Sequence, residues 1–106
     1  MSELIEECRK MNRMVKDSKE YKRYIHAKNA LGSNEELLRG VQELKRKYSD
    51  IQAFGEDNPY DEVYQLCSEN DDLLHNSIVN EYLTAECTLS RLIQNMLNEV
   101  TEGIEI

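Results

Sequence analysis

Three side chains with metal-binding atoms recur every four residues in the second half of the chain. Cys67, Asp71 and His75 would share one helix face, because residues four apart in an α-helix lie one above another. Thiolates, carboxylates and imidazoles are common zinc ligands, but a genuine site needs a further ligand, for which Asp72 and His26 are the conceivable suppliers. The end of an ordinary helix explains the same spacing without any ligand. We therefore expect no metal ion and no other cofactor.

Glu86 is the second residue in a chemically informative position, because it is the only charged residue within the apolar face of the last predicted helix. A carboxylate in such a place must be paired, hydrogen-bonded or protonated. It could be a working acid or an anchor for a specific partner. The simpler interpretation is a structural glutamate that accepts a hydrogen bond from a tyrosine hydroxyl or a lysine. No second carboxylate or nucleophile is placed beside it.

The sequence motifs of common enzyme classes are missing. There is no glycine-rich phosphate loop, no G-x-S-x-G, no H-E-x-x-H and no EF-hand loop. Four glycines and two histidines leave few residues from which to build an active site. We expect no catalytic residues, no small-molecule substrate and no enzymatic activity, but a function in binding other macromolecules.

Charge is divided unevenly along the 106 residues, whose net charge is −8. Residues 1–53 contain 12 Lys/Arg and 9 Asp/Glu, whereas residues 54–106 contain 1 and 12. The basic half offers a candidate surface on the first two predicted helices, which consists of Arg9, Arg13, Lys16 and Arg23. This surface could contact RNA phosphates or an acidic protein. Carboxylates interrupt it, which favours a solvated face that complements the acidic half of the chain.

Apolar spacing in steps of three and four predicts an all-α protein of about five helices, arranged as a small bundle in one domain that spans 1–106. The first helix covers about 2–16. Its apolar stripe is out of phase with the next one, so a second helix begins at a cap on Asp17 or Ser18 and ends near Leu31. Gly32 can then adopt a left-handed conformation.

Capping residues mark the remaining helices. Ser33–Glu36 has the spacing of a capping box before a third helix over about 34–53. Asn58 and Pro59 supply a cap and a first helical residue for a fourth helix, which fades from Asn70 onward. Asn76 caps a long C-terminal helix.

That last helix has the most regular apolar pattern in the chain. Its stripe consists of Val79, Tyr82, Glu86, Leu89, Ile93, Met96 and Val100. Neighbouring apolar residues widen the stripe to about half of the helix circumference, which is too wide for one neighbouring helix. We therefore expect these seven residues to contribute to an oligomer or partner interface.

Three dispersed cysteines, Cys8, Cys67 and Cys87, fit neither a disulfide framework nor a zinc knuckle. The acidic N-terminus does not resemble a signal peptide, and no apolar run is long enough to span a bilayer. We expect a cytoplasmic protein without membrane contact. A chain of this size with 40% apolar residues forms a modest core, which makes oligomerisation plausible.

The order of several short segments resembles that of the YlbF/YmcA family of bacterial regulatory proteins. Ser18–Tyr21, with Tyr24 and Ala27, resembles the start of the family's second helix. Asn34–Leu38 resembles its acidic, leucine-containing helix, and Ser77–Glu86 resembles the opening of its long last helix. The match covers nearly the whole chain.

The resemblance implies a cytoplasmic, non-enzymatic helical protein that associates with itself or with related proteins. Known members regulate competence, sporulation and biofilm formation, and are linked to a complex that modulates endoribonuclease action on messenger RNA. An iron–sulfur cluster has been attributed to that complex, but this chain has no clustered cysteines to hold one alone. The resulting hypothesis is a regulatory adaptor that works through protein–protein association. The alternative hypothesis is an RNA-binding module that uses the two basic helices.

Overall fold

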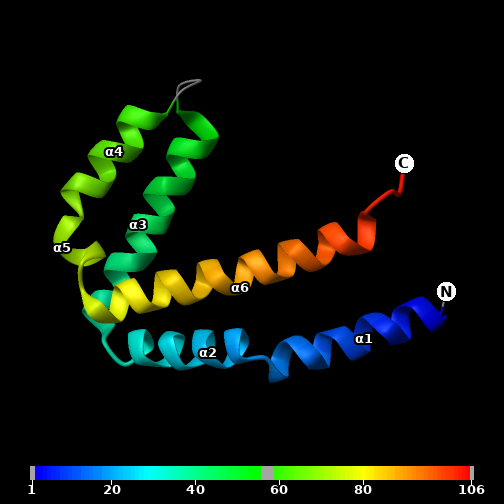
Figure 1. Ribbon diagram of the computed structural model, residues 1–106. Coiled ribbons are helices and arrows are strands. Elements are labelled where there is room, and N and C mark those ends of the chain that lie inside the picture. Colours follow the sequence, from blue (N-terminus) through cyan, green and yellow to red (C-terminus); the bar gives the residue numbers. More distant parts are fainter. Residues whose placement is uncertain (1, 56–58, 106) are drawn as a thin grey trace. The chain divides into compact units, whose positions relative to one another are not determined.

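The computed structural model describes residues 2–55 and 59–105, and these residues form six α-helices without a strand (Figure 1). The helices are α1 (Ser2–Asp17), α2 (Lys19–Gly32), α3 (Glu35–Phe54), α4 (Tyr60–Glu69), α5 (Asp71–Leu74) and α6 (Ser77–Thr101). The all-α class and the long C-terminal helix are confirmed. The sixth helix arises because the expected fourth helix is divided at Asn70, whose side chain bonds back to the Leu66 carbonyl at 2.8 Å.

Side-chain caps set the helix boundaries near the N-terminus. Ser18 separates α1 from α2, and its hydroxyl accepts a hydrogen bond from the Tyr21 amide at 3.2 Å. Of the two caps that the sequence allowed, Ser18 is therefore the one used. Gly32 is the last residue of α2 and does not have a positive φ, so the expected left-handed ending is wrong. Gly103, after α6, is the glycine with a positive φ (74°).

Asparagine side chains cap the N-termini of α3 and α6. The Asn34 side chain accepts from the Leu37 amide, whereas the Ser33 hydroxyl donates to the Asn29 carbonyl, so the predicted capping box is replaced by a single asparagine cap. The expected cap at Asn76 is confirmed, because its side chain accepts from the amides of Ile78 and Val79 at 2.9 and 3.2 Å. The expected cap at Asn58 lies outside the described residues.

The chain divides into two compact units. The central unit is Asn29–Glu81, and the terminal unit combines Met1–Lys28 with Tyr82–Ile106. Because both α2 and α6 cross this division, each unit contains part of both helices.

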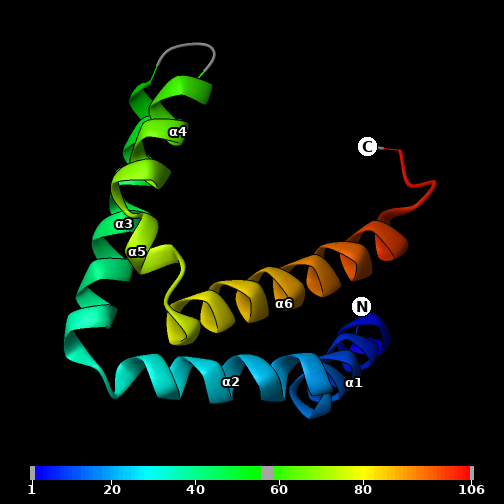
Figure 2. The same cartoon turned by 60° about the vertical axis from the view of Figure 1, so that its left-hand side comes forward.

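The central unit is built on α3 and α4, which lie side by side as an antiparallel pair in both views (Figures 1 and 2). Val41, Leu44 and Leu66 are buried there. At Gly40 the α5 side chain of Leu73 comes close to α3, since a Cβ on Gly40 would lie 3.2 Å from Leu73 Cδ1. The missing side chain therefore allows close packing of α5 on α3.

The terminal unit contains α1, most of α2 and the greater part of α6. Tyr24 of α2 and Tyr82 of α6 pack together with ring centroids 5.9 Å apart. Ala27, Tyr82 and Ala85 are buried in this unit, but no residue of α1 is. Apolar burial therefore decreases from the part of α6 beside α2 to the part beside α1.

Candidate protein-binding site

The seven stripe residues of α6 differ in burial along the helix. Val79 is 0% exposed and Tyr82 is also buried, while Glu86, Leu89 and Met96 are half-buried. Ile93 is exposed, and Val100 is 54% exposed. The expected stripe thus has a covered N-terminal part and an open C-terminal part.

Glu86 lies at the transition between these two parts. Tyr82 Oη donates a hydrogen bond to Glu86 Oε2 at 2.9 Å, one helical turn apart. This is the structural role that the sequence allowed for a carboxylate on an apolar face. The contact holds the carboxylate and satisfies the tyrosine hydroxyl whose ring packs on Tyr24.

The first helix is amphipathic but has no buried residue. Leu4 is 73% exposed, and Ile5 and Met14 are exposed as well. An isolated 16-residue helix has little stability in water unless its apolar face is packed. The apolar face of α1 is only partly covered within this chain, because Met11 and Val15 are half-buried and Leu4 and Met14 are exposed.

An open apolar groove, here called the α1/α6 groove, lies between these two helices and has a volume of about 410 Å³. It is lined by Cys8, Met11, Asn12, Val15, Ile93, Met96, Leu97 and Val100. A second hollow of about 370 Å³ continues it toward α2 and shares Met11, Val15 and Met96 with it. Asn12 is the uncharged polar member of a lining that is otherwise apolar or thiol-bearing, so the groove suits an apolar helix face better than a charged ligand.

The structure joins three of the predicted interface residues, Ile93, Met96 and Val100, in this groove. It does not place Val79, Tyr82, Glu86 or Leu89 there. The α1 side of the groove was missing from the predicted interface. Its signal was present in the spacing of Leu4, Cys8, Met11 and Val15, which indicates an apolar helix face but cannot show that this face stays uncovered.

The predicted basic surface lies on a different side of α1. Arg9, Arg13 and Lys16 follow a spacing of four and three and so form a ridge about 100° or more around the helix from the groove-lining Met11 and Val15. Arg9 forms an ion pair with Glu6 at 2.6 Å. Arg23 lies on α2, and it too has an interaction partner. Part of the predicted positive charge is therefore neutralised locally.

The predicted metal-binding face is interrupted. Cys67 belongs to α4, whereas Asp71 begins α5 and His75 follows it, with the break at Asn70 between them. His75 Nδ1 lies 2.8 Å from the Asp71 carbonyl oxygen, as expected near a helix end. Within residues 2–55 and 59–105, no three His, Cys, Asp or Glu side chains are grouped closely enough to hold a metal ion.

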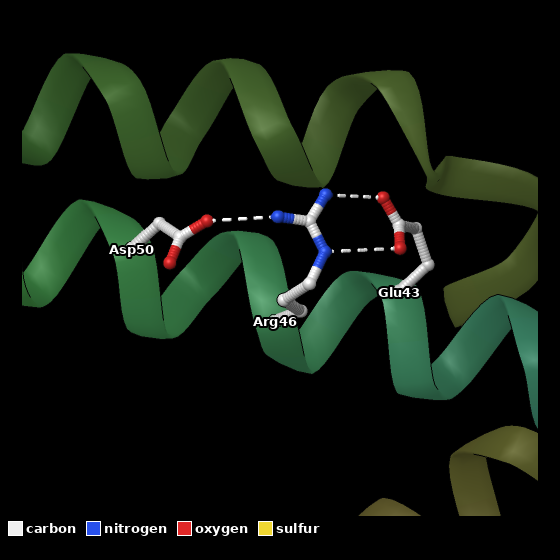
Figure 3. A network of polar contacts seen from close by, with 3 residues as sticks. All are labelled: Glu43, Arg46 and Asp50. Atoms are coloured by element: carbon white, nitrogen blue, oxygen red, sulfur yellow. Dashed lines mark hydrogen bonds and ion pairs between the residues drawn. The ribbon is translucent and has the colours of Figure 1, made fainter.

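An exposed ion-pair network occupies the middle of α3 (Figure 3). The Arg46 guanidinium donates to Glu43 on one side and to Asp50 at 2.9 Å on the other. The hydrogen bond from Arg46 lowers the pKa of the Glu43 carboxyl and raises the pKa of Arg46. Because all three side chains are on one helix and open to solvent, the network supports α3 without forming a binding site.

A family model described as "Control of competence regulator ComK, YlbF/YmcA" matches residues 4–105. The chain belongs to the YlbF/YmcA family. Two curated proteins are similar to it, each described as a UPF0342 protein. The one from Caldicellulosiruptor bescii is 28% identical over 94 residues, which cover 86% of this chain and 79% of the relative. The one from Caldicellulosiruptor saccharolyticus is 24% identical over 95 residues, with 87% and 79% covered.

No solved structure matches this YlbF/YmcA protein significantly. The family description places the chain among regulatory proteins rather than in a known enzyme family. In the part of the chain that the structure describes, no helix has the length and apolar character required to cross a membrane. The resemblance that the sequence carried is thus confirmed at the level of the family.

Proposed function

We propose that this YlbF/YmcA protein is a regulatory adaptor that binds protein partners through the α1/α6 groove. The observation that carries the proposal is the open groove between two amphipathic helices, one of which has no buried residue. An exposed apolar groove of this kind is typical of a protein–protein interface. The occupant would be an apolar helix face from a second copy or from a related family member.

The family resemblance gives the proposal its context. The process under control would be messenger RNA processing by an endoribonuclease complex, in which this chain would act by association and not by catalysis. Glu86 and the buried stripe residues would support the groove from the closed end of α6, whereas Ile93, Met96 and Val100 would contact the partner directly.

The test is light scattering coupled to size-exclusion chromatography, for the protein alone and mixed with a purified YlbF/YmcA relative. Ile93→Asp places a charge in the groove, and Asn95→Asp introduces the same charge about 200° around α6. We expect wild type and Asn95→Asp to form the same oligomer or mixed complex, and Ile93→Asp to lose it while retaining helical circular dichroism. A wild-type chain that stays monomeric and binds no relative would refute the proposal.

A salt series separates this function from the RNA-binding alternative. Apolar association should persist or strengthen when salt is raised, whereas phosphate binding should weaken steeply. The RNA alternative further predicts that neutralising Arg9, Arg13 and Lys16 abolishes binding to a single-stranded RNA probe. The local pairing of Arg9 with Glu6 makes this ridge a weaker candidate than the groove.

A further inference from the structure

A second exposed apolar surface lies on α4 of the central unit, and the adaptor function does not account for it. Tyr60 and Tyr64 are one helical turn apart, and their rings stack with centroids 6.5 Å apart and planes inclined by 20°. The two residues are 69% and 65% exposed. Two large, stacked aromatic rings held in solvent form an apolar patch of the kind that protein interfaces use.

The patch faces away from the core of its own unit. Leu66, the buried residue of α4, lies about 200° around the helix from Tyr64. Packing of α4 on α3 therefore uses one side of the helix and leaves the rings of Tyr60 and Tyr64 largely exposed. Phe54, the last residue of α3, is also highly exposed at the same end of the α3–α4 pair.

The charged side chains of α4 itself are all acidic. No lysine or arginine occurs between Lys47 and Arg91 in the sequence. Asp61 lies between the two tyrosines in sequence and is exposed, whereas Glu62 and Glu69 line a hollow on the other side of α4, together with Arg46 and Lys47 of α3. The faces of tyrosine rings are themselves electronegative, so rings and carboxylates attract the same kind of group.

We propose that this face of α4 binds an arginine-containing segment of a partner protein. A guanidinium group can stack on a tyrosine ring while its N–H groups donate to a nearby carboxylate, a combination that the compact ammonium of lysine matches less well. The surface belongs to the central unit, whereas the α1/α6 groove belongs to the terminal unit. An adaptor would then have two separate docking surfaces of different chemistry, one apolar and one acidic and aromatic.

The test uses a hexa-arginine peptide as probe and a hexa-lysine peptide for comparison, both titrated into the full chain and followed by backbone amide NMR shifts. We expect the shifts to concentrate on α4 and hexa-arginine to bind several-fold more tightly than hexa-lysine. The double variant Tyr60→Ala, Tyr64→Ala should weaken hexa-arginine binding by about tenfold, from about three- to fivefold per ring. Tyr48→Ala removes another exposed tyrosine, on α3, and should leave binding unchanged.

Four outcomes would overturn the proposal. Equal binding of the two peptides, or full binding by the double tyrosine variant, would show attraction to the net negative charge alone. Shifts spread over the whole chain would show the same. A change in oligomeric mass in the double variant would make this face a contact between copies. The peptides do not require the groove, so the Ile93→Asp variant should bind hexa-arginine as wild type does. Failure of the adaptor proposal and failure of this proposal can therefore be distinguished.

Discussion

The two compact units differ in how completely their apolar helix faces are covered. In the central unit, Val41 and Leu44 of α3 and Leu66 of α4 are buried, and Gly40 admits Leu73 at close range. In the terminal unit, α1 has an equally regular apolar face but no buried residue, and α6 exposes Val100 beside it. The same kind of sequence pattern therefore produces a closed core in one unit and an open groove in the other.

This difference shows that helical periodicity identifies an apolar helix face but does not show whether another element packs on it. A residue on an apolar stripe stabilises the protomer only where a second element removes it from water. The closed unit should therefore determine how stable the fold is, and the open groove should determine what the protein binds.

The largest expected effect comes from comparing a valine-to-aspartate substitution in the core of the central unit with the same substitution in the groove of the terminal unit. Val41→Asp introduces a carboxylate at a position that is 2% exposed and should lower the free energy of unfolding by about 4 kcal/mol or more. Val100→Asp introduces it in the groove, where water can reach it, and should cost about 0.5 kcal/mol in folding while weakening association. Urea unfolding followed by circular dichroism measures both. Equal losses of folding free energy in the two variants would contradict the proposed difference between a closed core and an open groove.

A smaller effect is expected from overpacking the closed unit at Gly40. Gly40→Val should destabilise the fold by about 1–3 kcal/mol, because its Cβ alone already comes within 3.2 Å of Leu73 Cδ1. Gly32→Val is a matched control, since nothing lies within 4 Å of a Cβ at that position. Thermal unfolding of the two variants should separate them clearly. A Gly40→Val protein as stable as Gly32→Val would show that α5 packs loosely on α3.

Tyr82→Phe tests the boundary between covered and open parts of α6. Loss of the hydroxyl removes a hydrogen bond to the half-buried Glu86 and should cost about 1 kcal/mol of folding free energy. A double-mutant cycle with Glu86→Gln isolates the contact, and a coupling energy near zero would contradict it. Association through the groove should remain, because Tyr82 is not part of the groove lining.

The sequence was sufficient for the helical class, for most helix boundaries and for the Asn76 cap, since these depend on local spacing and side-chain chemistry. It could not distinguish Val79 from Val100, which occupy the same stripe and differ only in tertiary cover. It placed the weakening of the fourth helix at Asn70 but did not predict the short helix α5 beyond it, where the bond from the Asn70 side chain to the Leu66 carbonyl interrupts the helix. The contribution of α1 to the groove likewise depends on tertiary packing, so it could be seen only in the structure.

The smallest expected effect concerns pH and the exposed network on α3. Arg46 lowers the pKa of the folded-state Glu43 carboxyl, mainly through its hydrogen bond, so any stabilisation from the pair is present above the ordinary carboxyl pKa of 4.5. It is lost as the pH falls through the lowered folded-state value.

The difference in urea midpoint between wild type and Glu43→Gln should therefore be small at pH 7 and vanish once the pH falls below the lowered folded-state pKa of Glu43. In an Arg46→Gln background the Glu43→Gln difference should be absent at both pH values. If the difference instead grew on acidification, the pair would oppose folding. A small, acid-labile difference would mean that buried apolar contacts in the central unit, and not surface charge, account for its stability.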